Sequence, residues 1–389
     1  MLTWIALTTG SLGVITLLFF VIKKLVQALK VKQPVFAQDQ FIVKFNDDVD
    51  EDTIASIHKK YKCEASCCNE TLGFQVVTTA KNINKMMKIY SELDEVEYAE
   101  PNYVFEASYI PNDSFYSFQY GPQKVSAPSA WDVTQSNAGI RIAILDTGVQ
   151  PNHPDLASKL VPGYNFIDNN TDTNDFNGHG THVAGIAAAT TNNGAGIAGM
   201  APLASIQPVK VLSNSGSGLL SQVADGIIYA VNQGVQVINL SLGSPQDTIT
   251  LEGAVNYAAS QGVVVIGAAG NNGSNALTYP AAYANVIAVA STTSSDQRSV
   301  FSNFGTWVQV AAPGSSILST YPTSTYSYLS GTSMAAPHVA GLAALLASQG
   351  RSASQIRTVI QNTCDPITGT GTNWVYGRIN ADRAVRSPL

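Results

Sequence analysis

Short runs of β-branched residues alternate with helical stretches throughout residues 109–389, and this alternation constrains the fold more than any other feature. The apolar runs are IRIAIL, SIQPVKV, VQVINLSL, VVVIGAA, VIAVA and WVQVAAP; the helical stretches include THVAGIAAA, SQVADGIIYAVNQ, LEGAVNYAASQ and SMAAPHVAGLAALLASQ. Strands that are apolar along their whole length belong to parallel sheets covered by helices on both faces. The sequence therefore predicts an α/β fold with a central, mostly parallel sheet.

Residues 1–108 differ from this segment because charged side chains are much denser there. Residues 37–108 contain the strand-like runs FIVKF, LGFQVVTT and VEYAEPNYVFEAS and the helical runs TIASIHKKYK and INKMMKIYSEL, which predict a small α+β domain. Within residues 1–36, the uncharged run 2–22 is long enough to cross a bilayer as a helix. Lysines follow this run and, if it is retained, would keep the domain after it cytoplasmic. An uncleaved anchor and a cleaved signal sequence are equally expected, and a buried soluble helix is the alternative.

Overall charge and cysteine content restrict the function and the covalent structure. The net charge is −6 and no basic cluster is present, which argues against a nucleic-acid partner. Only one of the four cysteines, Cys364, lies beyond residue 108, so the longer segment has no internal disulfide.

Four polar residues stand where parallel sheets usually carry their functional groups, beyond strand ends and at helix starts. Asp146 ends IRIAIL, Asn271 follows VVVIGAA, and His179 and Ser333 each begin a helical stretch. These residues would make an acyl-transfer site: a carboxylate that orients an imidazole, an imidazole that takes a proton, a hydroxyl that attacks, and an amide that stabilises the oxyanion.

Each motif taken alone has other interpretations. His179 and His182 could be a metal pair, but no third ligand accompanies them. The segment around Ser333 also resembles an α/β-hydrolase elbow, although the order Asp146, His179, Ser333 differs from the order in that fold. A peptide-binding protein without activity and a hydrolase of esters or lipids are the rival functions.

The motifs DTGV, NGHGTHVAG, NLSLG, AAGNNG and GTSMAAPHVAG together resemble the subtilisin-like serine proteases, closest to their thermitase branch, across residues 109–389. The resemblance implies a subtilisin-like three-layer fold preceded by a ferredoxin-like propeptide domain. It also implies a serine endopeptidase in which Asp146, His179 and Ser333 form the triad and Asn271 is the oxyanion donor. His182 and His338 would be packed structural neighbours.

The same resemblance places an extended peptide between the edges 215–219 and 241–243. The residues expected to bind substrate are Gly216, Gly218, Ser241, Leu242, Gly243, Ala268, Ala269 and Gly270. These are small or apolar, which predicts broad specificity with a preference for apolar or aromatic side chains. The expected partners are protein and peptide substrates and the chain's own propeptide, with the enzyme a monomer.

The resemblance divides the chain into an N-terminal signal or anchor segment (1–36), an inhibitory and folding propeptide (37–108) and a catalytic domain (109–389). Self-cleavage is expected near Ser108–Tyr109, with Phe105 in the fourth substrate pocket. An independent binding domain is the alternative for residues 37–108. The enzyme is expected to be secreted or extracellular, unless residues 2–22 keep it at a membrane.

Calcium is the cofactor that the resemblance implies, and oxygen-rich loops suit this hard cation. The first site would use Asp113, Asp155 and Asn193 with the main-chain oxygens of Thr190, Ala195 and Ile197. A second site would use Asp168 and Asp172; it should be weaker or empty, because Asn165 and Asn170 replace carboxylates of the thermitase branch. Solvated turns are the alternative for both loops. Val183 stands where that branch has a cysteine, so the catalytic domain should resist thiol reagents.

Overall fold

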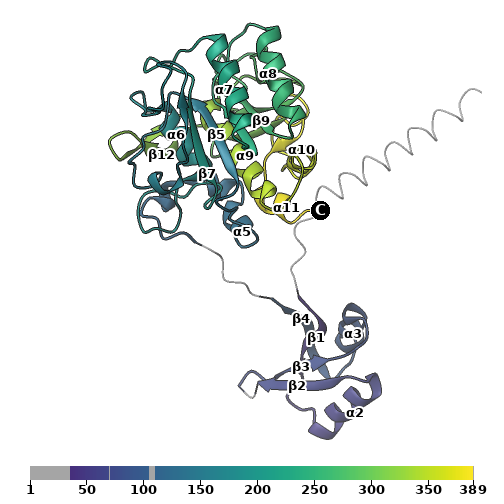
Figure 1. The fold of residues 1–389 in the computed structure, drawn as a ribbon. Coiled ribbons are helices and arrows are strands. Elements are labelled where there is room, and N and C mark those ends of the chain that lie inside the picture. The colour runs from purple at the N-terminus through teal and green to yellow at the C-terminus, as the bar shows by residue number, and fades with distance from the viewer. Residues whose placement is uncertain (1–35, 70, 105–109, 389) are drawn as a thin grey trace, which may run out of the picture. The chain divides into compact units, whose positions relative to one another are not determined.

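The computed structural model describes residues 36–69, 71–104 and 110–388, which fall into two compact units divided between residues 107 and 108 (Figure 1). The predictions for residues 2–22, for Phe105 and for the Ser108–Tyr109 bond lie outside the described residues. In the part that is described, no helix combines the length and apolar character needed to cross a membrane.

The N-terminal unit is a four-stranded antiparallel sheet with two helices. Its elements are β1 (Phe36–Phe45), α2 (Glu51–Tyr61), β2 (Glu64–Asn69), β3 (Phe74–Thr78), α3 (Ile83–Ser91) and β4 (Val96–Tyr103), in the sheet order β2-β3-β1-β4. Alternate residues of β1, namely Phe41, Val43 and Phe45, point into a core completed by the helices. This βαββαβ arrangement confirms the predicted ferredoxin-like domain; the short strand β2 was not predicted.

The C-terminal unit contains an eight-stranded sheet in the order β14-β11-β10-β9-β8-β5-β7-β6, and every strand pair in it is parallel. The strands are β5 (Arg141–Asp146), β6 (Tyr164–Asn165), β7 (Ser205–Lys210), β8 (Val237–Leu240), β9 (Val264–Ala268), β10 (Val286–Thr292), β11 (Val310–Pro313) and β14 (Gly377–Arg378). The helices are α4 (Tyr120–Lys124), α5 (Ala127–Trp131), α6 (His179–Ala188), α7 (Leu220–Asn232), α8 (Ile249–Ser260), α9 (Thr332–Ala347), α10 (Ala353–Asn362) and α11 (Ala381–Val385).

Successive residues of β5 show why this unit has three layers. Ile142 and Ile144 pack in a cluster with residues of α6 and α9, whereas Ala143 and Leu145 pack with residues of α7 and α8. Side chains of a strand point alternately to opposite faces, so the sheet is covered on both sides (Figure 1). The predicted α/β, subtilisin-like architecture is confirmed.

Helix α9 lies at the centre of this core. Every residue from Met334 to Leu346 is buried, and the run is rich in alanine, so the helix fits between the sheet and its neighbours. At Gly341, a Cβ would lie 2.4 Å from the Cβ of Met200, which leaves no room for a side chain. The helix that begins with the Ser333 turn is therefore also the main packing element of the unit.

A two-stranded antiparallel hairpin, β12 (Ile317–Tyr321) and β13 (Thr325–Leu329), precedes α9 and was not predicted. Side chains of the hairpin donate hydrogen bonds to main-chain carbonyls of helix α6. The Oγ of Ser319 donates to the carbonyl of His182, and the Oγ1 of Thr320 donates to the carbonyl of Thr181, both at 2.7 Å.

Candidate active site

Three neighbouring strands bring polar residues to one edge of the sheet. Strands β5, β8 and β9 are adjacent and parallel, so their carboxyl ends meet. Asp146 is the last residue of β5, Ser241 follows β8 directly, and Asn271 lies shortly beyond β9. The topology thus places these side chains together although they are far apart in sequence.

His179 is joined to Asp146 at this edge. The Nδ1 of His179 lies 2.7 Å from the Oδ1 of Asp146, and the same oxygen accepts the N–H of Thr147 at 2.7 Å. Asp146 is fully buried, whereas the His179 side chain is 28% exposed. Burial alone would lower the pKa of His179, but the charge and hydrogen bond of Asp146, with a further contribution from the charge of Asp175, raise it.

The glycines on either side of His179 are required by close packing. Gly178 has a φ of 102°, and a Cβ there would lie 2.5 Å from the ring of Tyr321. At Gly180, a Cβ would lie 2.1 Å from the carbonyl oxygen of Gly148. The GHG sequence therefore lets α6 begin directly against the turn that follows Asp146.

Ser333 is the second residue of α9 and is held by Ser241. The Oγ of Ser333 donates to the carbonyl oxygen of Ser241 at 3.1 Å, and the Oγ of Ser241 donates to the carbonyl oxygen of Ser333 at 2.8 Å. The buried amide of Asn239 donates to the Oγ of Ser241 at 2.9 Å. Among the described residues, Ser333 and His179 are not hydrogen-bonded to each other.

Asn271 is anchored through its side-chain oxygen. Its Oδ1 accepts the N–H and the hydroxyl of Thr332, at 2.9 and 3.0 Å. A Cβ on Gly331 would lie 3.5 Å from the Nδ2 of Asn271 and 3.6 Å from the main-chain nitrogen of Ser333. Both nitrogens therefore lie within 3.6 Å of one point beside Gly331.

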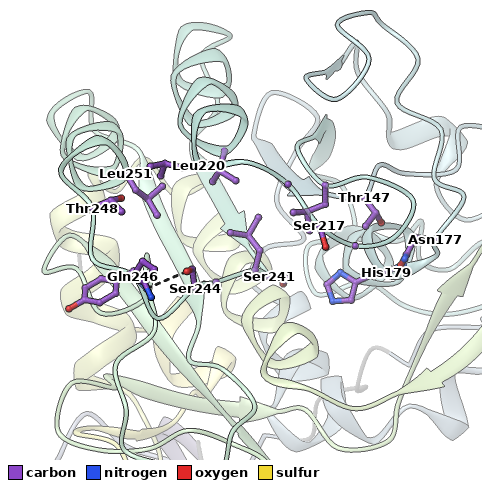
Figure 2. Close-up of a pocket in the computed structure, with 17 residues that line it drawn as sticks. Thr147, Asn177, His179, Ser217, Leu220, Ser241, Ser244, Gln246, Thr248 and Leu251 are labelled. Carbon is purple, nitrogen blue, oxygen red and sulfur yellow. Dashed lines mark hydrogen bonds between the residues drawn. The ribbon is translucent and has the colours of Figure 1, made fainter.

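A cavity of about 640 Å³ opens beside His179. Of the predicted substrate-binding residues, Gly216, Gly218, Ser241, Leu242 and Gly243 line it, whereas Ala268, Ala269 and Gly270 do not. Ser217, within the predicted edge 215–219, also lines it, and the lining residues missed by sequence reasoning are Thr147, Asn177, Leu212, Leu220, Val223, Ser244, Gln246, Thr248, Leu251 and Tyr279. Figure 2 shows His179 and Asn177 at one end of the cavity and Thr248 and Leu251 at the other.

The residues predicted for the first calcium site lie together. Asp155 accepts the side-chain amide of Asn193 at 2.9 Å and the N–H of Ile197 at 2.9 Å, and Asp113 accepts the N–H of Asn192 at 2.7 Å. The Oδ1 of Asp113 is buried with no hydrogen-bond partner, and burial raises the pKa of this carboxyl. An unpaired buried carboxylate oxygen facing an oxygen-rich loop fits a hard cation.

The described residues contain no group of three or more His, Cys, Asp or Glu side chains that could hold a metal ion. A cation at Asp113 and Asp155 would therefore depend on amide and main-chain oxygens as well. In the second loop, the Nδ2 of Asn165 donates to the Oδ2 of Asp168 at 3.0 Å and to the carbonyl of Asp172 at 2.8 Å. The amide of Asn165 thus occupies one carboxylate oxygen and one main-chain oxygen of this loop, as the amide of Asn193 occupies one oxygen of Asp155 in the first loop.

The other two histidines near the site are packed against main chain. His182 is fully buried, and its Nε2 lies 3.0 Å from the carbonyl oxygens of Ile317 and Ser327. His338 is also fully buried, with its Nδ1 2.9 Å from the carbonyl of Met334. Burial lowers the pKa of each to about 4, so both are neutral near pH 7.

The sequence of residues 137–378 matches the profile described as the subtilase family. This chain belongs to the subtilase family. Subtilases of this kind are serine proteases, so the chain is a hydrolase and not a peptide-binding module. Residues 23–102 match the fervidolysin N-terminal prodomain, which identifies the N-terminal unit as a prodomain.

Individual relatives agree with this assignment. Thermitase of Thermoactinomyces vulgaris is 61% identical over 279 residues, which cover 72% of this chain and 100% of thermitase. The thermophilic serine proteinase of Bacillus sp. (strain AK1) is 51% identical over 352 residues, covering 90% of this chain and 88% of that protein. A protease structure from Pseudoalteromonas arctica PAMC 21717 aligns with a TM-score of 0.67 and 35% identity, covering 71% of this chain and 98% of that one.

Proposed function

We propose that this subtilase is an endopeptidase that uses Asp146, His179 and Ser333 as its triad and Asn271 as an oxyanion donor. The hydrogen bond of 2.7 Å between Asp146 and His179 carries the proposal. It leaves Nε2 of His179 to act as the general base, while the buried carboxylate stabilises the imidazolium that forms.

Acylation then follows from the geometry of Ser333. Its hydroxyl turns from the carbonyl of Ser241 toward Nε2 of His179, loses its proton and attacks the substrate carbonyl carbon. The developing oxyanion accepts hydrogen bonds from the Nδ2 of Asn271 and the N–H of Ser333. His179 next gives its proton to the leaving amine, and water hydrolyses the acyl-enzyme by the same steps.

The test compares wild type with Ser333→Ala, His179→Ala and Asp146→Asn in casein hydrolysis, with labelling by a fluorophosphonate. Each variant is expected to lose about 10⁴-fold or more in kcat, the scale typical of this family's triads. The label should attach to Ser333 in wild type only. A folded His179→Ala variant with near-normal activity would disprove the proposed triad.

The cavity beside His179 supports broad specificity with an apolar or aromatic preference. Its lining contains the apolar residues Leu212, Leu220, Val223, Leu242, Leu251 and Tyr279 and no Asp, Glu, Lys or Arg. Main-chain pairing with the edges 215–219 and 241–243 would hold any extended peptide, so side-chain selection falls to such apolar surfaces. A peptide library should therefore be cut best next to apolar residues, and a strong Arg preference would contradict this proposal.

Residues 37–108 are proposed to inhibit the enzyme, to assist its folding and to be removed by cleavage near Ser108–Tyr109, giving a catalytic domain of residues 109–389. The match to a subtilase prodomain supports a zymogen. Intact mass of the whole chain provides the test. Wild type should lose about 100 residues, whereas Ser333→Ala should stay intact; processing of Ser333→Ala in the absence of other proteases would disprove self-cleavage.

Calcium is proposed as the structural cofactor, held by Asp113, Asp155 and Asn193 with the main-chain oxygens of Thr190, Ala195 and Ile197. When bound, the cation would neutralise two carboxylates that the fold brings together. The loop of Asp168 and Asp172 is proposed to bind calcium weakly or not at all, because Asn165 and Asn170 leave it with fewer carboxylates for a cation. The protein is also proposed to act outside the cell. Fractionation of the producing cells tests this, because the activity should then be found in the medium.

A further inference from the structure

A second carboxylate, Asp175, is buried beside the proposed triad. It is 2% exposed and lies in the loop before α6. Five donors surround it at 2.7 to 3.0 Å: the N–H groups of Asn177, Gly178 and Thr181 and the hydroxyls of Thr147 and Thr181. Each donor that moved away would cost the buried carboxylate a charge-assisted hydrogen bond, so the carboxylate holds the surrounding main-chain and side-chain groups in place.

Thr147 links this carboxylate to Asp146. Its Oγ1 donates to Asp175 at 2.9 Å and accepts the N–H of Gly180 at 3.0 Å. Its own N–H donates to the Oδ1 of Asp146, the oxygen that also contacts His179. Thr147 therefore connects the turn after β5 directly to Gly180 and, through Asp175, to Gly178, the two residues that flank His179.

The charged groups that face His179 come from several elements. Asp146 lies on β5 and Asp175 in the loop before α6, and both favour the imidazolium. Lys210, at the end of β7, donates to the carbonyl of Thr147 and is itself buried. His182, on the same helix as His179, is neutral near pH 7. Asp175 is thus the second negative charge close to the imidazole.

We propose that Asp175 and Thr147 are positioning residues for the reaction, an inference that rests on the proposed triad. Together they fix the start of α6 so that His179 stays against Asp146, and Asp175 adds a second buried negative charge near the imidazole. The two contributions are separable, because Thr147 carries the geometric link and Asp175 carries the charge.

The geometric part is tested with a matched pair, Thr147→Val and Thr147→Ser, in processed enzyme whose active sites have been titrated. Valine keeps the shape but removes the hydroxyl from Asp175 and Gly180, so kcat per titrated site should fall about 10- to 100-fold with KM little changed. Serine keeps the hydroxyl and should recover most of that loss. Equal kcat in the two variants, even with a lower Tm for valine, would overturn this part.

The charge part is tested with Asp175→Asn, which keeps the size of the side chain. Removing the charge makes the imidazolium less favourable, so the acid limb of the pH profile of kcat/KM should move down by about half a unit. Asp365→Asn is the control, because Asp365 is bound by Arg378, Arg383 and Asn380 in the C-terminal region and should leave the limb in place. An unmoved limb in a folded Asp175→Asn variant would overturn the charge role.

These outcomes are distinguishable from failure of the triad itself. A triad that is wrong would show as activity in His179→Ala or Ser333→Ala, whatever the Thr147 variants do. Asp175→Asn buries an amide among donors. Where it does not fold, Asp175→Ser, which also removes the charge, takes its place in the pH profile, while the Thr147 pair still decides the geometric part.

Discussion

Ser333 and Ser241 are joined by two reciprocal hydrogen bonds, each from one hydroxyl to the other residue's carbonyl oxygen. The proposed nucleophile is therefore held by the segment that follows β8, which is also one of the edges expected to pair with substrate. In this resting arrangement the hydroxyl is stabilised away from His179. Substrate that pairs with the Ser241 edge would compete for that carbonyl oxygen and release the hydroxyl toward the base.

Removing the Ser241 hydroxyl should impair both catalysis and folding. Ser241→Ala loses the hydrogen bond to the main chain of Ser333 and leaves the buried amide of Asn239 without its acceptor, at a cost of about 2 kcal/mol in the free energy of unfolding. Loss of alignment should reduce kcat about tenfold. Ser260→Ala is a matched control on the exposed end of α8, where the hydroxyl donates to the carbonyl of Tyr257 and accepts from the side chain of Gln261. Equal kcat in the two variants would count against this role for Ser241.

Replacing the proposed oxyanion donor should act on kcat and not on KM. Asn271→Leu keeps the approximate size but removes the Nδ2 that lies beside Gly331 and the Oδ1 that accepts from Thr332. The expected loss in kcat is about 10²- to 10³-fold, the magnitude typical of such a donor in this family. Steady-state kinetics on a chromogenic peptide would measure it. A change confined to KM would show that Asn271 binds substrate without stabilising the oxyanion.

The pH dependence of activity should reflect the raised pKa of His179. The base must be neutral to accept the Ser333 proton, so kcat/KM should fall as pH falls through this pKa. Asp146 raises the pKa above the usual 6.5, so the midpoint of the acid limb should lie above that pH in wild type. A profile measured with a small uncharged ester is the check, and a midpoint well below 6.5 would contradict the expected electrostatics.

Lys159 should make stability depend on pH in the alkaline range. It is 8% exposed, its Nζ bonds the carbonyl of Pro202, and burial lowers its pKa to about 8 from 10.5. The folded protein binds fewer protons than the unfolded chain between these values, so the contribution of Lys159 to stability falls as pH drops from 10.5 to 8.

Lys159→Met removes the cost of burying a charged amine. It should stabilise the inactive Ser333→Ala background at pH 7 by about 1 kcal/mol, after allowing for the lost hydrogen bond to Pro202. The gain should shrink or reverse near pH 10. Thermal unfolding at the two pH values measures it. Lys124→Met, which loses an ion pair with Asp296, is the control and should give no gain at pH 7. A gain independent of pH would refute the linkage.

Chelation should accelerate thermal inactivation through the first calcium site only. A cation bound to the folded state alone stabilises it by about 3 kcal/mol at a hundredfold excess over Kd. Asp113→Asn should abolish the difference between inactivation rates in calcium and in chelator, whereas Asp168→Asn should preserve it, because Asn165 and Asn170 leave the second loop with fewer carboxylates for a cation. Identical rates for wild type in calcium and in chelator would remove calcium from the proposal.

Six strands of the large sheet were predictable because they are buried on both faces and read as largely apolar runs, whereas the two-residue edge strands β6 and β14 are too short to give such a run. The hairpin β12–β13 was not predictable. The β13 sequence TYSYL is only partly buried, and on β12 the polar residues Ser319 and Thr320 bond the main chain of α6 instead of following a regular alternation. Strand β2 was missed for a similar reason: EASCCN has no clear alternation.

The proposed triad was predictable because its members stand at strand ends and helix starts within distinctive motifs. Most of the cavity lining was not, because residues such as Leu220 and Leu251 belong to helices whose apolar face reads as ordinary core. Asp175 was missed because nothing distinguishes it within a loop that also contains Asp168 and Asp172. Its role depends on five donors that come together only in the folded chain.

The position of Ser333 at the start of α9 has a consequence for biosynthesis. A ribosome makes the chain from the N-terminus, so Asp146 and His179 emerge long before the nucleophile. The helix that begins at Ser333 also supplies the centre of the core. A nascent or truncated chain lacking this helix has neither the proposed nucleophile nor a completed interior, so activity is expected only after the last helices of the domain have been made.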